Sequence, residues 1–427
     1  MTMRFVRAAL TACLLGAATS FALPFAAMPA YAAKPTGPSV SAPVAKLLQP
    51  AAKALEANDP QTALGLIKQA QALPDQTPFD TYKINEFLAN AAIKTGDHAT
   101  AEAAYIAMAD SPSLAEVTPE EKAQTLRIAG LLTTEQKHYD KGIKYLSAFN
   151  ALGGAPDPVA LSSLGQAYYY SNDYANAEAV AQKLIDTTPA GASPPQAAFE
   201  ILFVSQLKTN KQDAAMLTLE KSLTYYDDAE EWGQLIDTSL GVKGIKNLEG
   251  LHIYRLRVPA KAKGQADDYT IPASIALQAG YPVEAEAFLD AGIAAGVVQA
   301  SGKTAAQISE ARARANTDRA SIKQFDALAR KTATGDFDLR LAETYYGYGR
   351  YADAAEAARR ALTKGGPKTD SNEANMVLGE ALILQGDTAG GVAAFNALHN
   401  PTPGFAKAQH LWLLFANRKY AAATPAK

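Results

Sequence analysis

Histidine and cysteine, which often serve in catalysis and metal binding, are scarce in this chain. Among 427 residues there are one cysteine and five histidines: His98, His138, His252, His399 and His410. No two histidines stand at the spacing of metal ligands, and no H-E-x-x-H motif occurs. Because a zinc site needs three or four converging ligands, we expect solvated or packed histidines and no metal centre.

Two short segments look like catalytic motifs but lack the residues that would complete them. Residues 296–304 (GVVQASGKT) resemble a phosphate-binding loop, yet five residues separate the two glycines where the motif has four. Residues 205–208 (SQLK) match the S-x-x-K motif of penicillin-recognising enzymes, but the accompanying S-D-N motif is absent. We therefore expect a chain that is not an enzyme and that needs no cofactor.

The composition is typical of a folded chain. Hydrophobic residues make up 48% and charged residues 19%, and the formal net charge is −3. These values argue against wholesale disorder. A single cysteine excludes a disulfide scaffold, and 29 glycines without a period of three exclude collagen. Without a basic surplus, nucleic acid is not an expected partner.

The first 32 residues have the order of a secretory signal peptide. Two arginines form a basic head, residues 8–28 are apolar or small, and an A-x-A cleavage site ends at Ala32. Cleavage there would leave a chain beginning at Ala33, with a flexible leader rich in proline, glycine and serine over residues 33–43.

Two other interpretations of this segment are a membrane anchor and a lipoprotein signal. Pro24 interrupts the apolar run, which a cleavage pattern follows rather than charge, and this disfavours an anchor. Residues 10–13 (LTAC) match a lipobox, but the uncharged stretch before them is too short for a hydrophobic region. No later stretch of about 20 apolar residues occurs, so no transmembrane segment is expected after cleavage. The predicted location is a Gram-negative periplasm.

One pattern recurs along the chain: a turn residue, two polar or aromatic residues, and then a small residue. The turn residues are Gly96, Asn172, Gly349 and Gly386 in the clearest copies, and Asn58, Lys137, Asn210 and Gly280 in weaker ones. Apolar residues at steps of three and four on both sides of each turn indicate two helices. The small residues fall at steps of 34 to 41, at Ala63, Ala101, Gly142, Ala177, Ala215, Gly250, Ala285, Ala320, Ala354 and Gly391. Gly250 and Ala320 are placed by this phase alone.

The chain resembles the tetratricopeptide-repeat family, whose helix-turn-helix units recur every 34 residues. The best copy spans 157–191, with family residues at Leu164, Gly165, Tyr168, Tyr174, Ala177, Ala181, Leu184 and Pro189. The resemblance implies an all-α, right-handed α-solenoid of about ten repeats over 44–405. It is followed by a capping helix over 406–420 and a disordered tail over 421–427. Repeat identity is weakest over 226–260 and 296–332.

In this family the first helix of each repeat lines a concave wall that binds partners. The resemblance implies that the wall carries Glu86, Asn90, Ser162, Gln166, Tyr169, Tyr170, Glu343, Tyr346 and Glu380. Tyrosine suits recognition surfaces because it is rigid and amphipathic, although these tyrosines could instead only pack between repeats. Glu86 stands where members that clamp a C-terminal carboxylate have a cation, which argues against such a clamp.

The expected function is a non-enzymatic scaffold that binds a protein or peptide in the cell envelope, where it assists the assembly or coupling of a complex. A carbohydrate-linked role is the alternative, in which Tyr169, Tyr170 and Tyr346 stack against a polysaccharide during glycan export or wall remodelling. Glycan binding without any protein partner would favour the alternative.

Export and cleavage after Ala32 can be tested by measuring the mass of the chain in each cell fraction. The full chain, expressed in a Gram-negative host, should appear in the periplasmic fraction without its first 32 residues. Ala32→Leu should slow this cleavage, because the site requires small side chains. An uncleaved chain in the membrane fraction would support the anchor instead.

Overall fold

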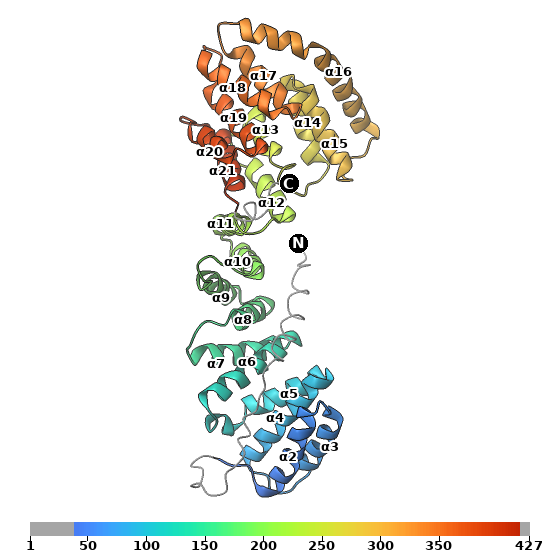
Figure 1. Ribbon diagram of the computed structural model, residues 1–427, viewed down its shortest axis with the longest axis vertical. Coiled ribbons are helices and arrows are strands. Elements are labelled where there is room, and N and C mark those ends of the chain that lie inside the picture. Colours follow the sequence, from blue (N-terminus) through green and yellow to red (C-terminus); the bar gives the residue numbers. More distant parts are fainter. Residues whose placement is uncertain (1–37, 419–427) are drawn as a thin grey trace. The chain divides into compact units, whose positions relative to one another are not determined.

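The computed structural model describes residues 38–418, and the regular structure in this range is entirely helical. Within the described residues the chain forms two compact units: unit 1 extends as far as Thr218, and unit 2 begins at Leu219. Unit 1 contains α2 (Ala42–Glu56), α3 (Pro60–Gln71), α4 (Pro78–Thr95), α5 (His98–Ala109), the short 3-10 helix η1 (Pro112–Ala115), α6 (Pro119–Glu135), α7 (Tyr139–Ala151), α8 (Pro158–Tyr170), α9 (Tyr174–Asp186) and α10 (Gln196–Lys208). Successive helices pair as hairpins (Figure 1).

Unit 2 continues the same succession with some departures. The division between the units falls inside α11 (Gln212–Leu223). The helices that follow are α12 (Ala229–Leu240), α13 (Asn247–Arg255), α14 (Asp267–Ala279), α15 (Pro282–Ala294), α16 (Gly302–Lys331), α17 (Asp336–Gly347), α18 (Tyr351–Lys364), α19 (Ser371–Gln385), α20 (Thr388–Asn396) and α21 (Pro403–Ala416). None of the helices within 38–418 has both the length and the apolar character needed to cross a bilayer.

Eight hairpins turn at a residue in the left-handed backbone conformation. These residues are Asn58, Gly96, Lys137, Asn172, Asn210, Gly280, Gly349 and Gly386, with φ between 58° and 90°. All eight are turn residues that the repeat pattern predicts. In four hairpins the next residue is an aspartate that accepts a hydrogen bond from a backbone N–H three residues on; these are Asp59, Asp97, Asp173 and Asp387. Each aspartate thus caps the second helix immediately after the turn.

The small residues that set the repeat phase lie where the two helices of a hairpin approach. Six of the predicted positions are alanines with no exposed surface: Ala63, Ala101, Ala177, Ala215, Ala285 and Ala354. In the α19/α20 hairpin, a Cβ atom added to Gly391 would lie 2.9 Å from the carbonyl oxygen of Gly379. A contact that short leaves no room for a side chain. The predicted phase is therefore confirmed at these positions.

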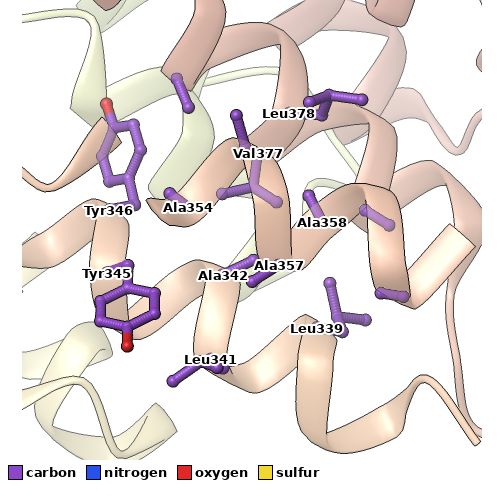
Figure 2. Close-up of a cluster of buried hydrophobic side chains, with 14 of the residues drawn as sticks. Leu339, Leu341, Ala342, Tyr345, Tyr346, Ala354, Ala357, Ala358, Val377 and Leu378 are labelled. Carbon is purple, nitrogen blue, oxygen red and sulfur yellow. The ribbon is translucent and has the colours of Figure 1, made fainter. Parts of the chain in front are cut away.

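The core of unit 2 shows what this close approach allows. Ala354, Ala357 and Ala358 of α18 are fully buried among larger side chains of α17 and α19, including Leu341 and Val377 (Figure 2). Alanine faces on α18 let both neighbouring helices come close, so the larger side chains interlock around them. The predicted all-α, repeat-built fold is confirmed.

Three segments differ from the predicted repeat boundaries. Ala320 was expected to follow a turn, but it lies inside α16, a single 30-residue helix, so the eighth repeat is not a hairpin. The first helix begins at Ala42 rather than after residue 43. The predicted capping helix over 406–420 corresponds to α21, which spans Pro403–Ala416. The signal peptide at 1–32, most of the leader at 33–43 and the tail at 421–427 lie outside the described residues.

Ala177→Leu tests the helix contact in the α8/α9 hairpin. Ala177 has no exposed surface, so the larger side chain should force the two helices apart and lower the free energy of unfolding by ~1–3 kcal/mol. Urea unfolding followed by circular dichroism measures this loss. Ala179→Leu, an exposed position on the same helix, is the matched control and should change stability by less than ~0.5 kcal/mol. Equal curves for the two variants would contradict the assigned contact.

Candidate functional site

In unit 1, the two residues of α4 that were predicted to line the wall are half-buried. Glu86 and Asn90 lie on this helix. Lys83 Nζ lies 2.9 Å from Glu86 Oε2 and 2.6 Å from Glu121 Oε1 on α6. Burial raises the pKa of Glu86, and the attraction of Lys83 only partly opposes it. Because Lys83 is shared between two carboxylates of the same unit, this wall offers no spare cation there for a partner's C-terminal carboxylate.

Helix α8 carries the most exposed of the predicted wall residues. Ser162, Gln166 and Tyr169 are half-buried, and Tyr170 is 40% exposed. Tyr168, predicted as a core residue, packs with Leu164 and places its hydroxyl 3.3 Å from Ser147 Oγ. Tyr168 is thus half-buried against this core cluster rather than fully buried as predicted, and Tyr170 is the more exposed of the two.

Four tyrosine rings form a continuous cluster, which we call the tyrosine ladder: Tyr139, Tyr170, Tyr169 and Tyr174. Tyr139 and Tyr170 stack with ring centroids 5.0 Å apart, and Tyr169 meets Tyr170 and Tyr174 edge-on at 5.4 and 5.7 Å. Tyr139 begins α7, whereas Tyr170 ends α8 and Tyr174 begins α9. The ladder therefore joins two successive hairpins near their turns. It packs between repeats and also presents an aromatic surface.

In unit 2 the predicted wall is not open, which corrects three predicted placements. Glu343 and Tyr346 of α17 and Glu380 of α19 were expected to face a partner, but they are 1%, 8% and 0% exposed. Figure 2 shows Tyr345 and Tyr346 pointing to opposite sides of α17, so they do occupy different surroundings. Helix α13 supplies the side chain that covers Tyr346: the Arg255 guanidinium lies 4.3 Å from the centre of its ring.

Arg255 is the centre of a buried ionic cluster. Its Nε and Nη2 atoms lie 2.6 and 2.9 Å from the two carboxylate oxygens of Glu284 on α15, a bidentate pair. Nη1 lies 3.0 Å from Glu380 Oε2, and Nη2 also contacts Glu343 Oε2. Burial alone would lower the pKa of Arg255, but the three carboxylates outweigh it and raise that pKa. One guanidinium thus ties α13 to three other helices.

His252, one helical turn before Arg255, fixes the other side of this cluster. Its Nδ1 atom lies 2.8 Å from Glu380 Oε1. The same Nδ1 atom lies 3.1 Å from Arg255 Nη1. Because a guanidinium can only donate a hydrogen bond and a carboxylate oxygen can accept one, we assign the Nδ1–H group as the donor to Glu380. The His252 carbonyl accepts a hydrogen bond from Trp412 Nε1 of α21 at 2.9 Å. Helix α21 therefore packs on α13 as well as on the last hairpin.

Sequence reasoning missed this cluster. The only local signal was a pair of basic side chains, His252 and Arg255, which stand three residues apart and alternate with the apolar Leu251, Ile253 and Tyr254. Their acidic partners lie between 29 and 128 residues away. No spacing rule connects such distant positions, so these ion pairs could not be predicted from the sequence.

The remaining histidines take structural or exposed positions. His138 is exposed, and its Nδ1 lies 2.6 Å from Glu102 of the preceding hairpin. His98, His399 and His410 are also exposed. Across residues 38–418, no three His, Cys, Asp or Glu side chains converge as a metal site would require. The tyrosine ladder and the polar side chains of α4 and α8 could bind a partner through aromatic faces and through amide or hydroxyl groups.

Comparison with known proteins yields no protein-family model and no curated protein that matches the chain. Solved structures do match. One is the MamA RS-1 ArsTM double mutant, with 18% identity over 43% of this chain and 94% of that chain, at a TM-score of 0.32. A tetratricopeptide repeat protein from Parabacteroides merdae ATCC 43184 matches with 12% identity over 79% of this chain and 98% of that chain, at a TM-score of 0.28.

The TPR domain of P58(IPK) matches 90% of this chain and 100% of its own length, with 12% identity and a TM-score of 0.23. Two of these three structures are of tetratricopeptide repeats, the architecture that the sequence resembles.

Tyr346→Ala tests the corrected placement of the unit 2 wall. Removing a buried ring that packs against Arg255 should lower the free energy of unfolding of unit 2 by ~3–5 kcal/mol. The two tryptophans of the chain, Trp232 and Trp412, are both buried in unit 2, so tryptophan fluorescence during urea unfolding measures it. Tyr170→Ala, at an exposed position in unit 1, is the control and should leave this transition unchanged. An unchanged transition for Tyr346→Ala would contradict the buried placement of Tyr346 and support the predicted open wall.

Proposed function

We propose that this chain is a non-enzymatic scaffold that binds a segment of another protein on unit 1, and that it works in the periplasm after export. The tyrosine ladder is the anchor of this surface. Ser162 and Gln166, half-buried on α8, supply hydrogen-bonding groups on the same helix as Tyr169 and Tyr170. Glu86 and Asn90 on α4 are further half-buried polar groups of unit 1. The predicted signal peptide supports the location, and the repeat architecture supports the role of scaffold.

The single observation that carries the proposal is the combination of exposure and rigidity at Tyr170. Its ring is 40% exposed, yet Tyr139 stacks on it and Tyr169 contacts its edge. A large side chain that is already ordered loses little conformational entropy when a partner covers it. Aromatic residues held in this way are over-represented among the residues that dominate binding energy.

Unit 1 is favoured over the corresponding wall of unit 2 because the latter is already covered. Glu343, Tyr346 and Glu380 contact Arg255 of the same unit rather than solvent. A partner would have to displace Arg255 from three carboxylates before reaching them. The binding role predicted for these three residues is therefore not part of the proposal.

The assembly or coupling of an envelope complex is the process that this scaffold would serve, as the resemblance to tetratricopeptide repeats implies. A stack of hairpins offers one elongated set of helices to a partner, which suits holding a chain segment rather than transforming a small substrate. Polysaccharide binding remains the competing outcome, since exposed rings also stack on sugars.

Tyr170→Ala should abolish partner capture without unfolding unit 1. A photo-reactive amino acid placed at Gln166, in cells, should crosslink one recurring protein that mass spectrometry identifies. Truncating an anchoring tyrosine costs ~2 kcal/mol or more of binding free energy, about thirtyfold in affinity. Recovery of that protein should fall accordingly in Tyr170→Ala. Unit 1 should stay folded and lose only the ~0.5–1.5 kcal/mol that each of its lost ring contacts contributes, which thermal melting measures.

Tyr170→Phe is the matched control, because it keeps the ring and removes only the hydroxyl group. It should retain most of the capture. A second probe at Ala179, exposed on α9, should not give the same crosslink. Binding of the purified chain to a glycan array, with loss in Tyr170→Ala and no recurring protein crosslink, would replace the proposal with the polysaccharide role.

A further inference from the structure

The ionic cluster around Arg255 is short of positive charge. We call it the Arg255 clamp: Arg255 and His252 of α13, with Glu284, Glu343 and Glu380. All five side chains are at most 3% exposed. If every carboxylate is ionised, the clamp carries a charge of −2 with neutral His252 and −1 with protonated His252. A buried surplus of charge is costly, because the protein interior stabilises an ion much less than water does.

The titratable groups facing the clamp from neighbouring elements do not correct this surplus. They are Glu373 of α19, Asp370 before α19, Tyr281 before α15, Tyr346 of α17 and Tyr351 of α18. From α21, the Phe405 ring lies 5.6 Å from His252, and Trp412 donates to its carbonyl oxygen. None of these groups brings a positive charge.

One carboxylate oxygen in the clamp also lacks a donor. Glu343 Oε2 contacts Arg255, but Oε1 is buried and has no hydrogen-bond partner. A buried acceptor without a donor is destabilising. A proton on this network would remove one negative charge, and it could be held on any of the linked carboxylates because they share Arg255.

We propose that the Arg255 clamp is a proton-dependent latch on α13. In the folded chain the clamp holds at least one proton more than the same residues hold in the unfolded chain near neutral pH. Acidification therefore tightens α13 against α15, α17 and α19, and rising pH loosens it. This inference does not depend on the proposed binding role of unit 1.

The electrostatic environment supports this direction for three groups. Burial alone would lower the pKa of His252, but the carboxylate of Glu380 outweighs burial, and the net change is upward. Burial raises the pKa of Glu284, and Arg255 only partly opposes it. Burial, followed by repulsion from Glu343, raises the pKa of Glu373 to about 7.

These directions fix the sign of the pH dependence. A group with a raised pKa in the folded state holds its proton there after the unfolded chain has released it. Its stabilising contribution is complete below its unfolded pKa and is lost as pH rises through the folded value. For Glu373 this window runs from the ordinary glutamate value of 4.5 to about 7, and for His252 it begins at 6.5 and extends upward. Unit 2 should be most stable in mild acid.

Urea unfolding of the full chain, followed by tryptophan fluorescence between about pH 5 and pH 8, tests the latch. Trp232 and Trp412 report unit 2, and Trp412 is bonded to α13 itself. Each retained proton should increase the unfolding equilibrium constant up to about tenfold per pH unit as pH rises. A constant that stays flat or falls with rising pH would overturn the proposal.

The Glu343→Gln variant tests whether the pH dependence of unfolding arises in the clamp. The substitution keeps the shape of the side chain, removes one negative charge and adds a possible donor, so it should flatten the pH dependence. Glu356→Gln is the matched control, because this α18 glutamate is half-exposed and paired with Arg330 and Arg360; it should keep the wild-type slope. A wild-type slope in Glu343→Gln would overturn the latch.

A second variant keeps the test decisive if Glu343→Gln does not fold. Glu373→Gln removes the neighbouring charge without breaking a contact to Arg255. It should reduce the slope between about pH 5 and pH 7 and leave the response above pH 7. Amide hydrogen exchange of α13 in the unmodified chain, corrected for intrinsic rates, should then show protection that falls as pH rises. Protection that is constant or rises would overturn the proposal.

Discussion

The close approach of two helices at a small side chain is the contact on which the rest of this structure depends. Ala177 and its equivalents have no exposed surface, and the contact between Gly379 and Gly391 leaves no room for a Cβ atom. Helices that meet this closely leave their larger residues to interlock around the contact. A single hairpin still has an uncovered apolar face, so it must stack on its neighbours. The turn, the helix cap and the stacking of hairpins all depend on this close approach of the two helices.

Unit 2 departs from simple stacking because α13 brings a charge into its interior. An arginine taken out of water must be paired completely, and Arg255 meets this demand with Glu284, Glu343 and Glu380 from three separate helices. Breaking such a cluster costs far more than a surface ion pair does. The same residues that a repeat would present to a partner are therefore used to hold the unit together.

This difference between the units decides where a partner could bind. In unit 1 the tyrosine ladder links two hairpins and keeps Tyr170 accessible. In unit 2 the residue that corresponds to Tyr169 is Tyr346, and it lies under the guanidinium of Arg255. Equivalent places in a repeat can thus differ in burial: Tyr169 is half-buried, whereas Tyr346 is buried. Family position alone does not distinguish them, because exposure depends on what else the chain folds against that helix.

The helical hairpins, their turns and their small-residue contacts could all be predicted from the order of residues along the chain. These features repeat at short range: Asn172 fixes a left-handed turn, Asp173 caps the next helix, and Ala177 lets the helices close, all within six residues. The outward position of Tyr170 also followed from helical periodicity. Only the tertiary structure decided that α16 is one uninterrupted helix and that α13 covers Glu343, Tyr346 and Glu380. Arg255 lies 88 residues from Glu343 and 125 from Glu380, and periodicity within a repeat carries no information about an ion pair that forms only when distant helices pack together.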